Sequence, residues 1–281
     1  MASNDSSKNT IWTRQNTDDA LIVQAASRWF YNTADWLNLI NWTGMVILAI
    51  VGTIKLETFV VVMQIIWFFV GFYLDCVVTR NIAKGTGFRT EFDHYVFGWS
   101  SKLPDSTVRQ AKLAMSTHPK WVVTQTTHNG SNPQKGGVKD WYYNKPAWDR
   151  LQATKNAMLE NTGFDKRVNH MVCLEVVLVL VGIITIGVIN KESLFKMLVA
   201  MFVVFSVPVR KLGDTIMNVL EVQNENSQLE RDIEKATSVS ELVDAQNKIN
   251  KKRLIPNTSP MFAYWLLRRR VDKIFHNTTL S

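Results

Sequence analysis

The sequence predicts a mainly α-helical integral membrane protein, with four transmembrane helices arranged as two hairpins and a mixed, mostly helical cytoplasmic domain built from the central and C-terminal segments. Two observations predict this class. The apolar residues are concentrated in two blocks, residues 37–78 and 171–209, and the rest of the 281-residue chain is polar and charged. The basic residues largely avoid both blocks, although the chain carries a net charge of +8.

The first block is predicted to form one helical hairpin. Residues 44–54 and 58–78 are almost entirely apolar, and a short turn at 55–57 separates them. About twenty apolar residues are needed to cross a hydrocarbon layer of about 30 Å. The first helix must therefore begin further back, near Leu37.

The second block repeats this design. Residues 171–189 and 193–209 form two apolar stretches, joined by the polar turn 190–192. The alternative is a pair of buried helices in a soluble protein. Soluble cores seldom contain helices of this length that are apolar on every face, so two further membrane spans are expected.

The positions of Lys and Arg predict the orientation of these spans. Their number is 3 in residues 1–36, 1 in 37–78, 14 in 79–170, 2 in 171–209 and 12 in 210–281. Lys and Arg accumulate on the cytoplasmic side of a membrane. The N-terminal arm, the central segment and the C-terminal segment are therefore all expected in the cytoplasm, with both chain ends. The polar first thirty residues predict no cleavable signal peptide.

Helical periodicity predicts most of the elements outside the two blocks. These elements are a helix from Asp18 to Leu37 that enters the first span, a short helix at 107–115, a strand at 121–127, a loop at 128–137 and a helix at 148–168. The strand is predicted from its β-branched residues. Gly85, Gly87, Gly136 and Gly137 are expected to be loop glycines.

The C-terminal segment is predicted to be helical as well. A long helix continues from the fourth span to about Ala236. Ser238 and Glu241 form a capping box for the next helix. Ser259 with Pro260 marks the start of a third helix.

The motifs give no support to catalysis. The five histidines have no neighbours at metal-ligand spacing. No Walker loop, GxSxG or GxGxxG motif is present. We therefore expect no enzyme activity, no catalytic residues and no metal site.

Two acidic residues in the predicted spans, Asp75 and Glu175, are candidates for lining a pore or pinning helix contacts. Carboxylates inside a membrane are costly and usually face protein or water. Both residues lie within about one helical turn of the expected cytoplasmic boundary. Solvation at the interface is therefore the alternative interpretation.

The central segment, residues 79–170, carries most of the net charge. It holds 14 basic and 7 acidic residues, a surplus of +7, and aromatic residues are interleaved with them. This mixture suits an anionic ligand that also stacks, as a nucleotide does. Basic residues beside a membrane also suit anionic lipid head groups, and the tryptophan and arginine cluster at 265–270 has the same two interpretations.

Several motifs occur in an order and spacing that resemble a known family. They are Ile11, Gln15, Asn16, Leu21, Gln24, Arg28 and Tyr31 in the N-terminal arm, Glu91-Phe92-Asp93 and Val96-Phe97-Gly98-Trp99 after the second span, Asp140-Trp141-Tyr142, and Gln246, Ile249, Arg253, Pro256, Tyr264 and Arg268 near the end. They resemble the SMODS-associated four-transmembrane effector family of bacterial anti-phage systems. The resemblance covers residues 11–275, but the family's run of Arg, Cys and Trp is largely replaced at 151–160.

The resemblance implies a multi-pass effector in the bacterial inner membrane, paired with a nucleotidyl cyclase. Its cyclic nucleotide product, expected to be a cyclic dinucleotide, would be a regulatory ligand of the cytoplasmic domain rather than a cofactor. The residues assigned to this ligand are Trp99, Trp141 and Tyr142 for stacking, Arg89, Lys145 and Arg150 for phosphates, and Arg253 and Arg268 from the C-terminal helices. Core packing is the alternative role for Trp99 and Trp141. No DNA or RNA partner is implied.

The implied mechanism couples ligand binding to membrane damage. Binding would change the packing of the cytoplasmic helices against the two hairpins, so that subunits oligomerise, disrupt the bilayer, and kill or arrest the infected cell. The alternative is a membrane-anchored scaffold or adaptor, which would bind a protein partner or anionic lipid without forming a pore. Selective binding of one cyclic nucleotide separates these two functions.

Overall fold

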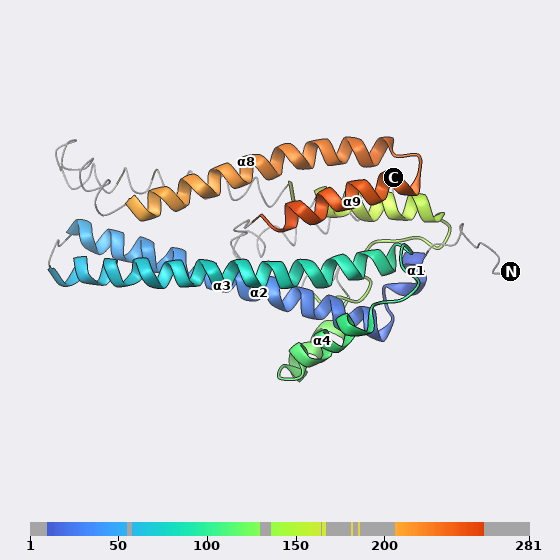
Figure 1. Cartoon of the computed structure of the whole chain (residues 1–281), viewed down its shortest axis with the longest axis horizontal. Helices are drawn as coiled ribbons and strands as arrows, with labels where there is room; N and C mark the ends of the chain where they lie inside the picture. Colours follow the sequence, from blue (N-terminus) through green and yellow to red (C-terminus); the bar gives the residue numbers. More distant parts are fainter. Residues whose placement is uncertain are drawn as a thin grey trace.

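Helices make up nearly all of the structure that the computed structural model describes (Figure 1). The described residues are 10–54, 58–129, 136–163, 165–166, 181, 185 and 206–255. Their helices are α1 (Thr10–Arg14), α2 (Asp18–Ile54), α3 (Thr58–Val96), α4 (Asp105–Met115), α5 (Pro119–Thr127), α8 (Ser206–Lys235) and α9 (Val239–Arg253), with a further helix at 150–163. The mainly helical class predicted from the sequence is confirmed for this part of the chain.

α2 and α3 form a long antiparallel hairpin (Figure 1). The predicted N-terminal helix and first span are one helix of 37 residues, and the second span belongs to a helix of 39 residues. Hydrogen bonds between the two helices run from Ser27 Oγ to Gly85 O at 2.9 Å, from Asn41 Nδ2 to Gly71 O at 3.3 Å and from Gln64 Nε2 to Leu48 O at 3.1 Å. These contacts fix the register of the hairpin along its length.

Asp75 takes part in this helix pairing. Its Oδ1 accepts a hydrogen bond from Asn41 Nδ2 at 3.0 Å. Close approach of the helices nearby is made possible by Gly44, where a Cβ would lie 1.9 Å from an atom of the Trp67 ring. A contact between helices is one of the two roles expected for Asp75, and the lining of a pore stays a prediction.

The outer surface of the hairpin is apolar. By length and composition, the helix over Val62–Val96 contains a stretch that is apolar enough to cross a membrane, and 11% of that stretch is buried. Among the described residues this is the one helix of that kind. Large side chains such as Phe59, Phe69 and Phe72 are exposed on it, whereas a core helix of a soluble protein is mostly buried. The predicted hairpin at 171–209 lies almost entirely outside the described residues, so the count of four spans stays a prediction.

α3 continues far beyond the predicted span and stops at a glycine. It ends at Val96, and Gly98 has a φ of +77°. Glycine adopts this left-handed conformation without the clash that a Cβ would cause. The chain turns away at this point, because Gly98 N donates to Tyr95 O at 3.1 Å.

Two of the predicted loop glycines lie inside α3. Gly85 and Gly87 are helical, so that prediction is wrong for both. At Gly85 the missing side chain lets α2 come close, since a Cβ there would lie 3.2 Å from Ser27 O. A Cβ at Gly87 would meet nothing within 4 Å.

The predicted strand at 121–127 is wrong, because these residues belong to α5. Pro119 stands in the first turn of the helix, where its missing N–H removes no helical hydrogen bond. Thr124 and Thr127 donate their hydroxyls to carbonyls four residues earlier, at 2.9 and 2.6 Å. Such bonds satisfy β-branched polar residues within a helix. The predicted short helix at 107–115, by contrast, is confirmed as α4.

α8 and α9 form a second antiparallel pair (Figure 1). α8 ends at Lys235, close to the predicted end. The predicted capping box is confirmed, because Ser238 Oγ accepts from Glu241 N at 3.4 Å and Glu241 Oε2 accepts from Ser238 N at 3.2 Å. The predicted helix after Ser259 lies outside the described residues.

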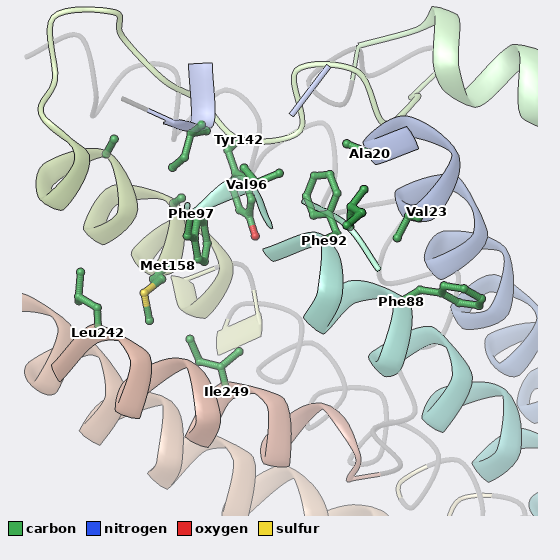
Figure 2. Close-up of a cluster of buried hydrophobic side chains, with 14 of the residues drawn as sticks. Ala20, Val23, Phe88, Phe92, Val96, Phe97, Tyr142, Met158, Leu242 and Ile249 are labelled. Atoms are coloured by element: carbon green, nitrogen blue, oxygen red, sulfur yellow. The ribbon is translucent and has the colours of Figure 1, made fainter. Parts of the chain in front are cut away.

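One apolar core joins α2, α3, the helix at 150–163 and α9 (Figure 2). Its members in the figure include Ala20 and Val23 of α2, Phe88, Phe92 and Val96 of α3, Phe97, Tyr142, Met158, and Leu242 and Ile249 of α9. The core therefore draws on the N-terminal arm as well as on the central and C-terminal segments. Its packing positions the polar groups described next.

Candidate functional site

A carboxylate, Asp93, is buried in the middle of this core. It belongs to α3, and its side chain has no exposed surface. Residues four positions apart share a helix face, so Arg89 points to the same place. An isolated buried carboxylate is very costly. The groups around Asp93 therefore determine what the site can do.

Four side chains contact the Asp93 carboxylate. Arg253 Nη1 lies 2.7 Å from Oδ2, and Arg89 Nε lies 3.2 Å from Oδ1. Tyr142 donates its hydroxyl to Oδ1 at 2.6 Å, and Gln246 Nε2 donates to Oδ2 at 3.1 Å. We call these five residues the Asp93 cluster. It joins α3, the segment before the helix at 150–163, and α9.

Arg89 is held by aromatic rings and by further hydrogen bonds. Its Cζ lies 4.7 Å from the ring centroid of Trp141 and 5.2 Å from that of Tyr142. A guanidinium over an aromatic face is attracted by the ring quadrupole. Its Nη2 also donates to the Tyr142 hydroxyl at 2.8 Å and to Asn161 Oδ1 at 3.3 Å. Arg89 thus has a fixed position before any ligand arrives.

The N-terminal arm positions the segment that carries Trp141 and Tyr142. Gln15 Oε1 accepts from Tyr142 N at 3.0 Å, and Gln15 Nε2 donates to Tyr142 O at 3.4 Å. Asn16 makes a similar pair with Asp140, because its Nδ2 donates to Asp140 Oδ1 at 2.6 Å and its Oδ1 accepts from Asp140 N at 2.9 Å. These paired bonds fix the backbone on both sides of Trp141.

Arg28 of α2 holds the beginning of the same segment. Its Nη1 donates to Gly136 O at 3.0 Å and to Gly137 O at 2.8 Å. Gly137 approaches the backbone of α5 so closely that a Cβ would lie 1.8 Å from His128 O. Only glycine fits here, which confirms the loop role predicted for Gly137.

A second ion pair anchors α9 beside the cluster. Lys252 is buried, and its Nζ lies 2.6 Å from Asp165 Oδ2 and bonds to Asn226 Oδ1 of α8. Lys252 and Arg253 are consecutive, so the last turn of α9 is tied to two different carboxylates. Basic residues are also favourable at a helix C-terminus because of the helix dipole.

The Asp93 cluster carries one surplus positive charge. Arg89 and Arg253 bring two positive charges and Asp93 brings one negative charge, while Lys252 is matched by Asp165. In the described part of the chain, Nη1 of Arg89 and both Nε and Nη2 of Arg253 have no acceptor. An uncompensated buried charge is costly. The arrangement therefore favours the arrival of an anion.

Gln246 contributes a hydrogen-bond acceptor, its Oε1, to which no group in the described residues donates. Its Nε2 donates to Asp93 and to Asn250 Oδ1, the latter at 3.0 Å. Its Oε1 is buried, with no hydrogen bond from the described residues. Leaving a buried acceptor unsatisfied costs about 1–3 kcal/mol. A donor on a ligand would remove that cost.

Burial and charge act in opposite directions on Asp93. Burial raises the pKa of its carboxyl, but the guanidiniums of Arg89 and Arg253 outweigh burial and hold the pKa below its usual value. For Tyr142, burial dominates and raises the pKa of the hydroxyl. At neutral pH the carboxylate is therefore ionised, and the phenol stays protonated to donate to it.

The structure brings together four of the eight residues that the sequence assigned to a ligand. These are Arg89, Trp141, Tyr142 and Arg253. Lys145 lies beside Trp148, with its Nζ 5.7 Å from the centroid of that ring. Arg268, like Glu175 in the third predicted span, lies outside the described residues.

The remaining two assigned residues, Arg150 and Trp99, lie at the end of α3. Arg150 Nε donates to Phe97 O at 3.0 Å and its Nη2 donates to Gly98 O at 2.7 Å. Trp99 packs edge-on against Phe97, with ring centroids 5.1 Å apart. In these positions both side chains stabilise the turn after α3.

Asp93 and Gln246 are the members of the cluster that sequence reasoning did not assign to the site. The available signal was the spacing of Arg89 and Asp93, an opposite-charge pair four residues apart beside Phe88 and Phe92. A charged pair on the apolar face of a helix is expected to be buried and to need partners. Gln246 gave no comparable local signal.

Comparison with known protein families gives a match over almost the whole chain. The family described as the SMODS-associating 4TM effector domain matches residues 9–281. No curated protein and no solved structure matches the chain. Within the described ranges, no group of three or more His, Cys, Asp or Glu side chains is arranged to hold a metal ion.

Proposed function

The chain belongs to the family of SMODS-associating 4TM effector domains, and we propose that a cyclic oligonucleotide controls it by binding at the Asp93 cluster. The family implies a membrane effector of anti-phage signalling that works with an SMODS cyclase and its signal. The identity of that signal as the direct ligand, the cytoplasmic location of the cluster, and the disruption of the inner membrane by assembled subunits are the parts that we propose.

The observation that supports ligand control is the meeting of two guanidiniums and an aromatic pair at one cationic cluster. Arg89 and Arg253 come from elements far apart in the chain, and the partly buried ring of Trp141 lies 4.7 Å from Arg89 Cζ. Guanidiniums pair with phosphate oxygens in a fixed geometry, and nucleobases stack on aromatic rings. A cyclic oligonucleotide offers both kinds of group.

α3 supplies the connection between this ligand site and the bilayer. Arg89 and Asp93 lie on the same unbroken helix as the apolar stretch that begins at Val62. A ligand that changes the packing of the cluster therefore shifts a helix that enters the membrane. Different affinities for two conformations are enough for the ligand either to trigger or to restrain the effector.

The first experiment is a thermal-stability screen of the detergent-purified protein against cyclic mono-, di- and trinucleotides. A ligand that binds only the folded state raises its apparent stability, so one compound is expected to raise the melting temperature selectively. Arg89→Gln is expected to abolish that shift. Lys248→Gln serves as the matched control, because Lys248 also lies on α9 and makes an exposed ion pair with Asp232 of α8.

Two results would contradict the proposal. The first is the absence of a shift with every compound, and the second is a shift that persists unchanged in Arg89→Gln. Membrane disruption needs its own measurement, which is dye leakage from liposomes that contain the protein. No leakage under any nucleotide condition would favour a membrane-anchored scaffold instead.

A further inference from the structure

The net charge of the Asp93 cluster indicates the amount of negative charge that its ligand carries, as well as the sign of that charge. The cluster is short of neutrality by one negative charge, since Arg89 and Arg253 face the single carboxylate of Asp93. The side chains of Arg89 and Arg253 are largely buried, with 7% and 12% of their surface exposed. Charges in such surroundings interact more strongly than in water, so one added monoanion would balance the cluster.

The open N–H groups indicate the shape of that anion. Nη1 of Arg89 and both Nε and Nη2 of Arg253 have no acceptor among the described residues. Paired guanidinium N–H groups match the paired oxygens of a phosphate. A phosphodiester carries one negative charge, whereas a terminal phosphate monoester carries about −1.5 to −2 at pH 7. The single negative charge of a phosphodiester equals the surplus positive charge of the cluster, whereas the charge of a monoester exceeds it.

We propose that the Asp93 cluster binds one phosphodiester monoanion between Arg89 and Arg253, and that Gln246 Oε1 accepts a hydrogen bond from a base or ribose of the same ligand. This inference rests on the proposed function and specifies its ligand class. Asp93 is then a positioning residue that holds both guanidiniums.

Asn250 offers a substitution that supplies the missing charge from within the protein. Its Oδ1 accepts from Arg253 Nη1 at 3.1 Å and from Gln246 Nε2 at 3.0 Å. Asn250→Asp has the same shape, keeps an acceptor at that position and adds one negative charge. Asn247→Asp is the matched control, because it makes the same chemical change on the same helix at an exposed position.

The experiment measures the melting temperature of the full-length protein in detergent with two probes. One is dimethyl phosphate, a phosphodiester monoanion without hydrogen-bond donors, compared with sodium chloride at equal ionic strength. The other is the panel of cyclic nucleotides. Both dimethyl phosphate and one cyclic nucleotide are expected to stabilise the native protein and Asn247→Asp.

Asn250→Asp is expected to differ from the native protein in its melting temperature without ligand and in its affinity for both probes. Without ligand it should melt at a higher temperature than the native protein, because its cluster is already neutral. Its affinity for either probe should fall by at least about tenfold, the effect of about 1.4 kcal/mol. Gln246→Met should weaken the nucleotide but leave dimethyl phosphate unaffected, because dimethyl phosphate has no donor for Gln246.

The outcomes separate this inference from the proposed function. If a cyclic nucleotide stabilises the native protein and Asn250→Asp equally, the surplus charge is not what binds it, and the function stands without the inference. If dimethyl phosphate binds as expected but no cyclic nucleotide does, the diester site stands and the proposed function fails. A loss of folding in Asn250→Asp would overturn the surplus of positive charge itself, and no response to either probe would overturn both proposals.

Discussion

Arg253 Nη1 lies 2.7 Å from Asp93 Oδ2, although 160 positions separate the two residues in the chain. Arg253 is the last residue of α9, and Asp93 lies in the last turn of α3. The contact forms only when the C-terminal helices return to the end of the α2–α3 hairpin. The ion pair therefore depends on the assembly of the whole core.

Asp93→Asn is expected to destabilise the protein by about 3–5 kcal/mol, because it leaves two buried guanidiniums without a counter-charge. The measurement is the free energy of unfolding in detergent at neutral pH. Asp232→Asn is the control, since Asp232 makes an exposed ion pair with Lys248. Exposed pairs contribute about 0–1 kcal/mol. Equal stability of the two variants would show that the Asp93 cluster is not a buried charge network.

Lowering the pH should remove the stability that the ionised Asp93 carboxylate contributes to the folded protein. Its pKa in the folded protein is below the ordinary value of 3.8, so the ionised form is preferred by the folded state. The stability from this group is therefore complete above pH 3.8 and is lost as the pH falls through the folded pKa. The melting temperatures of the native protein and of Asp93→Asn should therefore converge as the pH falls from 3.8 towards about 1. A constant difference over that range would contradict the lowered pKa.

Raising the pH into the alkaline range should destabilise the folded protein by deprotonating Tyr142. The pKa of its hydroxyl is raised above the ordinary value of 10.0, so the folded state holds this proton more tightly than the unfolded state. The stability from the group is complete below pH 10 and decreases as the pH rises further. Tyr142→Phe should lose this alkaline dependence. An absorbance titration of tyrosinate can follow the same residue directly.

Gly137→Ala and Gly87→Ala should have opposite effects. At Gly137 the added Cβ would meet the backbone oxygen of His128 at 1.8 Å, so the segment that carries Trp141 must move. We expect a loss of stability of about 1–3 kcal/mol and a loss of ligand response. At Gly87 the added Cβ meets nothing within 4 Å inside α3, and alanine should stabilise the helix by about 0.5–1 kcal/mol.

Arg150→Ala should lower stability without changing the ligand response. Its guanidinium bonds Phe97 O and Gly98 O, and charge-assisted hydrogen bonds contribute about 1.5–3 kcal/mol when buried. Partial exposure of Arg150 reduces that figure to about 1–2 kcal/mol. The melting temperature with and without nucleotide measures both effects. A selective loss of the nucleotide shift would instead place Arg150 at the ligand, as the family resemblance implies.

Local sequence patterns were sufficient for several elements and failed for α5 and for the part of α3 that contains Gly85 and Gly87. The apolar spacing of Ala20, Val23 and Ala26 predicts α2, and Ser238 with Glu241 predicts the start of α9, because these signals act within one or two helical turns. α5 was predicted as a strand from its β-branched residues. The helix is stabilised by threonine hydroxyls that bond to its own backbone and by the packing of Trp121 on Trp29, with centroids 5.3 Å apart. That packing partner lies far away in the sequence.

The dependence on partners far away in the sequence also explains why the candidate site was predicted only in part. Arg89, Tyr142 and Arg253 were assigned from charge, aromatic content and family resemblance. Which charged residues of the central segment are buried depends on the packing of three separate parts of the chain. The contacts that bring Gln246 and Arg253 to Asp93 form only when α9 lies against α3.

The unbroken course of α3 makes it a lever arm. Asp75 and Asp93 are 18 positions apart on this helix, which corresponds to about 27 Å at about 1.5 Å per residue. A tilt of about 10° around the Asp75 contact would therefore displace the Asp93 end by about 5 Å. Under the proposed function, small movements at the cluster would reach the membrane as a change of angle rather than of position. An angular signal of this kind would change how neighbouring hairpins cross, without requiring any helix to slide through the bilayer.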